Sequence, residues 1–152
     1  ITGWAEAWSV GHASNDECDA LGMSEAQRLA ARRALDGLGV TPDRVLLDGS
    51  WDFVGGGRVT TVTGGDATCL SIAAASVLAK VTRDRIMRDA DSRFPGYGFA
   101  DNKGYPSPRH VDVLSQRGAC LFHRRSWSFM DGLPPVGEPR RDQTGAHPRL
   151  FS

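Results

Sequence analysis

One long helical pattern near the middle of the sequence most constrains the fold. From residue 68 to about residue 90, apolar and small side chains share one broad face: Leu70, Ala73, Ala74, Val77, Leu78 and Val81. Two short runs rich in aliphatic and β-branched residues precede this pattern, at residues 45–47 and 58–63. Because small residues let a helix lie close to a sheet, this order predicts an α/β fold.

Helix-capping signals mark further elements on both sides of this core. Ser14 with Glu17, and Ser24 with Gln27, have capping-box spacing and predict two consecutive helices, the second ending at residue 37 or 39. Residues 1–10 favour a buried or half-buried strand. Glycines and a proline predict an irregular loop over residues 94–105, and a Ser-Pro start predicts a helix from residue 107 to 118.

Length and composition limit which classes of protein this chain can belong to. A chain of 152 residues with 40% hydrophobic residues is the size of one domain, which we expect over residues 1–130, followed by a disordered tail at 131–152. Lys plus Arg and Asp plus Glu each number 18, so net charge favours no partner. Cys18, Cys69 and Cys120 match no disulfide or metal pattern and indicate free thiols in the cytoplasm. No segment resembles a membrane span or an export leader.

Asp48 and Asp66 each follow one of the two predicted strands. Open α/β sheets place ligand sites at the carboxyl ends of their strands, where converging carboxylates would need a hard cation such as Mg²⁺ between them. Alternatively, Asp48 starts a turn with Gly49 and Asp66 caps the long helix. Spacing alone favours this second interpretation.

Two clusters combine positive charge with an aromatic ring, as a nucleic-acid backbone site would. They consist of Lys103, Tyr105, Arg109 and His110, and of His123, Arg124, Arg125 and Trp127. An ordinary solvated surface explains each cluster equally well or better. A third charged group, Lys80, Arg83, Asp84 and Arg85, is expected to form ion pairs along its helix.

Several segments between Trp4 and Trp127 resemble the ribonuclease HII family, both in their residues and in their order along the chain. The strongest stretch is DATCLSIAAASVLAKVTRDR at residues 66–85. Leu47-Asp48-Gly49 lies upstream of it. Downstream, in family order, come Pro95-Gly96-Tyr97-Gly98-Phe99, Lys103-Gly104-Tyr105, His110 and His123-Arg124-Arg125-Ser126. This resemblance, and not composition, carries the functional hypothesis.

The resemblance implies a ribonuclease H-like mixed sheet flanked by helices, and four acids that hold two Mg²⁺ or Mn²⁺ ions. Asp48 and Asp66 match two of these acids. The implied monomeric enzyme hydrolyses RNA paired with DNA, and single ribonucleotides embedded in duplex DNA, on the 5′ side of the ribonucleotide, as in ribonucleotide excision repair. Tyr105 matches a tyrosine that stacks on the sugar of the next deoxynucleotide, and Lys103, Arg124 and Arg125 are expected to bind the substrate.

The sequence departs from the family pattern in two respects. It contains no adjacent Asp-Glu pair followed by a Gly-Arg-Gly loop, and Gly64 stands where the family often has a lysine. With Ile1 as its first residue, we expect the chain to be part of a longer enzyme, without its first strands and inactive alone. The alternative hypothesis is a non-catalytic scaffold that binds RNA–DNA hybrids.

Overall fold

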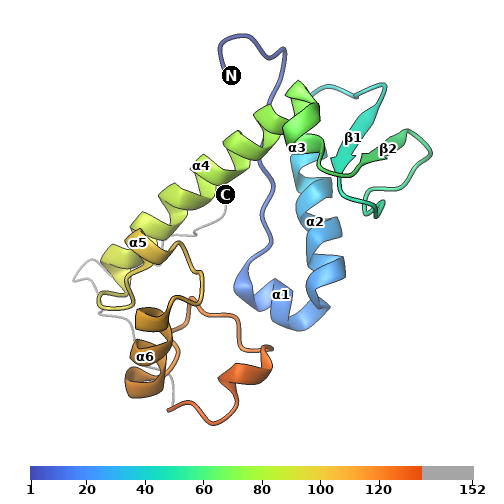
Figure 1. The fold of residues 1–152 in the computed structure, drawn as a ribbon. Coiled ribbons are helices and arrows are strands. Elements are labelled where there is room, and N and C mark those ends of the chain that lie inside the picture. Colours follow the sequence, from blue (N-terminus) through green and yellow to red (C-terminus); the bar gives the residue numbers. More distant parts are fainter. Residues whose placement is uncertain (135–152) are drawn as a thin grey trace. The chain divides into compact units, whose positions relative to one another are not determined.

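A computed structural model of the chain describes residues 1–134, which form two compact units (Figure 1). The N-terminal unit, Ile1–Thr82, contains α1 (Asn15–Leu21), α2 (Met23–Asp36), β1 (Val45–Asp48), β2 (Val59–Val62), α3 (Gly65–Thr68) and the first part of α4 (Leu70–Arg93). The C-terminal unit begins at Arg83 and contains the rest of α4, α5 (Phe99–Asn102), α6 (Pro108–Arg117) and the short 3-10 helix η1 (Ser128–Met130).

The first two helices are joined by an ion pair. Ser14 caps α1 in the expected capping box with Glu17, whose carboxylate also accepts hydrogen bonds from Arg33 of α2 at 2.6 and 2.7 Å. The Arg33 bonds, followed by the Ser14 amide, hold the pKa of Glu17 at about 2.

The second expected capping box is wrong: α2 begins after Gly22, without a side-chain cap, so Ser24 already lies within the helix.

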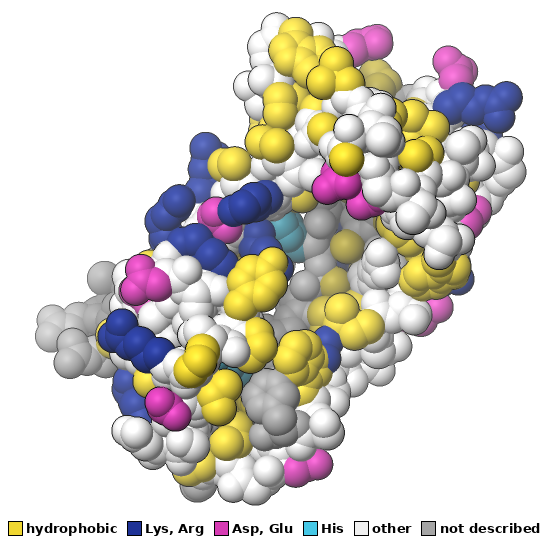
Figure 2. Space-filling model, viewed as in Figure 1, with side chains coloured by type: hydrophobic (Ala, Val, Ile, Leu, Met, Phe, Trp, Pro, Cys, Tyr) yellow, Lys and Arg dark blue, Asp and Glu magenta, His cyan; other side chains and the backbone are white. Residues whose placement is uncertain are grey.

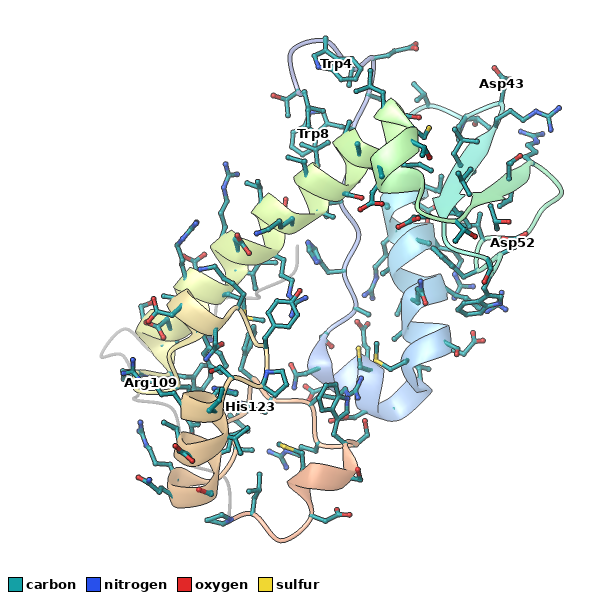
Figure 3. All side chains as sticks on the ribbon, in the orientation of Figure 1. Trp4, Trp8, Asp43, Asp52, Arg109 and His123 are labelled. Atoms are coloured by element: carbon teal, nitrogen blue, oxygen red, sulfur yellow. The ribbon has the colours of Figure 1, made fainter. Side chains whose placement is uncertain are left out.

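The strand expected at residues 1–10 does not form. The amides of Trp4 and Ala5 both bond to the Ile1 carbonyl at 3.1 Å, which closes a turn in place of extended backbone. Trp4 is 63% exposed and Trp8 49% exposed, and Figure 3 shows both on this N-terminal segment. A strand needs a partner that takes its backbone hydrogen bonds, and this segment pairs with neither β1 nor β2.

Within residues 1–134 the sheet consists of two parallel strands, with Val45 opposite Val59 and Asp48 opposite Val62. In β1 only Leu47 is buried, and Leu46 is 41% exposed. With one neighbouring strand and little helix cover, the second face of β1 meets solvent.

The apolar face of α4 is also open. Leu70 is 75% exposed, Val77 49% and Val81 42%, so the residues expected to pack against a sheet lie at the surface. An apolar groove of about 520 Å³ is lined by the first residues of the chain, by α2 and by α4. Hydrophobic side chains are correspondingly prominent on the surface in Figure 2. No helix within residues 1–134 has the length and apolarity needed to cross a membrane.

The main hydrophobic core lies in the C-terminal unit. It consists of Ala90, Phe94, Tyr97, Phe99, Leu114, Ala119 and Cys120.

Ser107 caps α6 and Pro108 occupies its first turn, as expected, and Gly118 ends the helix. The predicted loop at residues 94–105 is irregular apart from the single turn of α5, yet it supplies three of the core rings. Of the tail expected at 131–152, residues from 135 onward lie outside the described part.

We expect Phe99→Ala to destabilise the protein by about 3–5 kcal/mol, because it removes a ring that is 2% exposed and packs against Tyr97 and Phe122. Urea unfolding would measure the loss. Val111→Ala, at a position 44% exposed on α6, is the matched control and should change stability by less than about 1 kcal/mol. Equal effects of the two substitutions would contradict this assignment of the core.

Candidate active site

Asp48 is the last residue of β1, and its position depends on the strand pair. Leu47 anchors the strand, and the amide of Gly49 donates to the carbonyl of Val62 at 3.0 Å, which extends the pairing one step beyond Asp48. The side chain of Asp48 is exposed at this edge of the sheet. The strand end therefore presents a carboxylate to solvent.

Two glycines bring the start of α3 to this carboxylate. The amide of Gly65 donates to Asp48 Oδ1 at 2.8 Å. A Cβ at position 65 would lie 2.5 Å from Ile72 Cδ1, so any larger residue would require the Ile72 side chain to move. Gly64 adopts φ of 66°, which glycine reaches without strain. Asp66 follows directly, so the backbone holds both acids at the same edge of the sheet.

The structure separates the alternative roles of the two acids. Asp48 does bond to a backbone amide, which agrees in part with a local structural role. Asp66, however, does not cap the long helix, because it lies inside α3, and α4 begins after Cys69. Gly65, which ties the two acids together, was not identified from the sequence. The consecutive glycines before an acidic residue were the signal for it.

The two acids alone make a small donor set. Residues 1–134 contain no group of three or more His, Cys, Asp or Glu side chains that could hold a metal ion. Two exposed carboxylates at adjoining strand ends still suit a hard divalent cation, since Mg²⁺ commonly binds one or two carboxylates and keeps water or phosphate as its other ligands. The donor chemistry therefore fits such an ion but is insufficient for a two-metal cage.

The expected substrate residues Lys103 and Tyr105 lie in the C-terminal unit, directly after α5. Lys103 has φ of 51°, and its ammonium donates to the carbonyl of Ala100, so part of its hydrogen-bonding capacity is used within its own loop. Tyr105 is 63% exposed, and the guanidinium carbon of Arg83 lies 5.1 Å from its ring centroid. An exposed ring on a fixed backbone is able to stack on a ligand.

Arg124 and Arg125 also belong to the C-terminal unit. The guanidinium carbon of Arg124 lies 4.6 Å from the ring centroid of Trp127, whereas Arg125 is exposed. Arg109 is exposed in the first turn of α6. These arginines keep a positive surface on the unit, because the guanidinium group stays protonated.

The two histidines of the basic clusters contact each other through their rings. His110 is 5% exposed, and its Nε2 lies 3.2 Å from Nε2 of His123 (Figure 3 labels His123, near α6). Burial, and then the neighbouring His110, lower the pKa of His123 to about 4. With this lowered pKa, His123 does not add to a cationic surface near neutral pH.

One proton arrangement agrees with the main hydrogen-bond distances in this pair. Nδ1 of His123 accepts from the amide of Cys120 at 3.0 Å, so its proton is on Nε2 and is donated to His110. His110 then donates from Nδ1 to the carbonyl of Tyr97 at 2.9 Å. Asn102 donates to that same carbonyl at 2.8 Å. The two imidazoles thus join α6 to the segment that precedes Arg124.

Comparison with known proteins identifies the relatives of this chain. The family model described as Ribonuclease HII matches residues 5–130. The chain is 52% identical over 132 residues to Ribonuclease HII of Streptomyces coelicolor, covering 86% of this chain and 57% of the relative. It is 44% identical over 151 residues to that of Myxococcus xanthus, covering 97% of this chain and 52% of the relative. The chain thus spans little more than half the length of these relatives.

We expect stability to fall as the pH is lowered from about 6.5 to about 4, because the His123 imidazole gains a proton more readily in the unfolded chain than in the fold. The loss assigned to His123 is on the order of 2–3 kcal/mol. Urea unfolding of the wild type and of His123→Gln at several pH values would measure it. The variant should lose less stability over this window, and parallel profiles would contradict the assignment.

Proposed function

This chain belongs to the ribonuclease HII family, and we propose that it is part of a metal-dependent endonuclease that cleaves the RNA strand of RNA–DNA hybrids and single ribonucleotides within duplex DNA. The match over residues 5–130, at about half identity to curated relatives, carries this proposal. The bond between Gly65 and Asp48 supports it, because it aligns the two family acids at one edge.

In this proposal Asp48 and Asp66 bind divalent ions, Mg²⁺ or Mn²⁺. Such ions would supply an activated water and a charge that stabilises the leaving 3′ oxygen in phosphodiester hydrolysis. The chain's own contribution is to hold the carboxylates. The Gly65 amide donates to Oδ1 of Asp48. Oδ2 of Asp48 is therefore available to bind an ion while that hydrogen bond is kept.

Two carboxylates are too few for two ions, so we infer that further acidic ligands come from outside residues 1–134. The unpaired edge of β1 supports this inference, since a two-stranded parallel sheet is unusual on its own and further strands would complete a ribonuclease H-like mixed sheet. The greater length of the relatives leaves room for such strands.

The C-terminal unit would contact the nucleic acid. We propose that the exposed ring of Tyr105 stacks on the sugar that follows the ribonucleotide, and that Lys103, Arg124 and Arg125 bind backbone phosphates. A ribose 2′-hydroxyl would distinguish the target from DNA. The absence of a disulfide among Cys18, Cys69 and Cys120 suits the reducing cytoplasm, where we propose that the protein acts as a monomer.

A second candidate function is a scaffold that binds RNA–DNA hybrids without cleaving them. The small donor set at Asp48 and Asp66 favours it, as does Gly64 in place of a family lysine. Metal-dependent cleavage by the full-length protein would exclude this candidate, whereas hybrid binding without cleavage would support it.

In the full-length protein, Asp48→Asn should abolish cleavage, by about a hundredfold or more, and leave duplex binding nearly unchanged. The amide oxygen of asparagine can still accept from Gly65, so the fold is retained while the charge that binds metal is lost. Cleavage of a ribonucleotide-containing duplex and fluorescence anisotropy would measure the two effects. Asp43→Asn, an exposed residue before β1, is the control. Full Mg²⁺-dependent activity of Asp48→Asn would refute the metal role.

Tyr105→Ala should weaken the preference for an RNA-to-DNA junction over a uniform hybrid, because a lost stacking platform is worth roughly 1–3 kcal/mol. The ratio of kcat/KM for the two substrates would report it. Tyr105→Phe keeps the ring and should keep the ratio. If the ratio were the same in Tyr105→Ala as in the wild type, the stacking role would be wrong even with Asp48 confirmed.

A further inference from the structure

Arg83 was expected to form ion pairs along α4, but it contacts the loop that carries Tyr105. Its guanidinium carbon lies 5.1 Å from the Tyr105 ring centroid, over the ring, and its Nη2 donates to the carbonyl of Lys103 at 3.0 Å. A single planar side chain therefore holds both the backbone and the ring of the loop.

The backbone of this loop is already fixed on its other side. Asn102 accepts from the Gly104 amide at 2.7 Å through its side chain and from the Tyr105 amide at 2.8 Å through its carbonyl. Lys103 and Gly104 both have positive φ, of 51° and 79°. A Cβ at position 104 would lie 2.8 Å from Met87 Cε, so the loop lies directly against α4.

The ring of Tyr105 is less constrained than its backbone. It is 63% exposed, and the guanidinium of Arg83 lies over one of its faces. A ring held from one face leaves the opposite face open to a ligand. An ordered ring loses less conformational entropy on stacking than a freely rotating one.

We propose that Arg83 is a positioning residue for junction recognition: its guanidinium holds the ring of Tyr105 so that the open face meets the sugar beyond the ribonucleotide. This inference rests on the proposed function of Tyr105. It assigns to Arg83 a role in substrate discrimination that acts through Tyr105, with no contact of its own to the reacting atoms.

The first test measures the junction preference, as the ratio of kcat/KM for a single-ribonucleotide duplex to that for a uniform hybrid, in the full-length protein. Arg83→Ala should lower this ratio about two- to fivefold, the range expected for an exposed cation–π contact. Arg83→Lys should also lower it, because an ammonium cannot reproduce the planar contact. Arg88→Ala, an exposed arginine of the same helix, should leave it unchanged.

A double-mutant cycle separates positioning from direct binding. Adding Arg83→Ala to Tyr105→Ala should produce no further change in the ratio, because the two residues act as a unit. If Arg83 instead contacted phosphate, its loss would weaken both substrates equally and reduce the salt dependence of binding. An equal loss on both substrates, or a further fall in the Tyr105→Ala background, would overturn the proposal.

A spectroscopic measurement tests the contact independently of activity. The chain has two tyrosines, so selective ring labelling gives signals from Tyr97 and Tyr105 alone. Arg83→Ala should shift the Tyr105 ring resonances and leave those of Tyr97, which lies 5.1 Å from Arg117, in place. Unmoved Tyr105 resonances would overturn the inference. If Tyr105→Ala failed to change the junction preference while Arg83→Ala still moved the ring signals, the stacking function would fail and the contact would stand.

Discussion

The hydrogen bond from the Gly65 amide to Asp48 Oδ1 connects the sheet of the N-terminal unit to its helices. Asp48 ends β1, and Gly65 begins α3 and lies close enough to Ile72 of α4 that a Cβ would press on the Ile72 side chain. This one contact therefore fixes where the chain leaves β2 and where α4 starts. It also uses one oxygen of the carboxylate to which we assign metal binding, so folding and chemistry share the same side chain.

The C-terminal unit orders its exposed groups on a buried polar network. His110 and His123 contact each other through their Nε2 atoms, and Nδ1 of His110 contacts the Tyr97 carbonyl beside an aromatic core. Asn102 bonds to that same carbonyl and to the Gly104 amide. The loop that carries Tyr105 is therefore joined to the core through Asn102. A charged imidazole at this place would need solvation that the core does not offer.

Local signals in the sequence predicted local structure well, apart from the capping box expected at Ser24. Ser14 and Ser107 cap helices as their spacing indicated, and both strands form within one or two residues of the expected bounds. Signals that depend on distant partners failed. Residues 1–10 have strand composition but no pairing edge, and Val77 of the α4 face is exposed, because periodicity does not specify what covers a face. The acids Asp48 and Asp66 were singled out by their places after two predicted strands and were assigned a role by resemblance. The contacts of Gly65 and Arg83, which position site residues, were visible only in three dimensions.

The features that the sequence failed to predict in the N-terminal unit have a common physical origin. A parallel strand pair, an apolar groove of about 520 Å³ and an exposed helix face all leave hydrophobic surface or backbone groups without partners among residues 1–134. The acidic pair is short of ligands, and one of its members, Asp48, ends β1, whose outer edge has no partner strand among residues 1–134. Further strands that paired with β1 would cover apolar surface and bring their own carboxyl-end residues beside Asp48. Completion of the sheet and completion of the metal site would then be a single structural event, and stability and metal affinity should rise together.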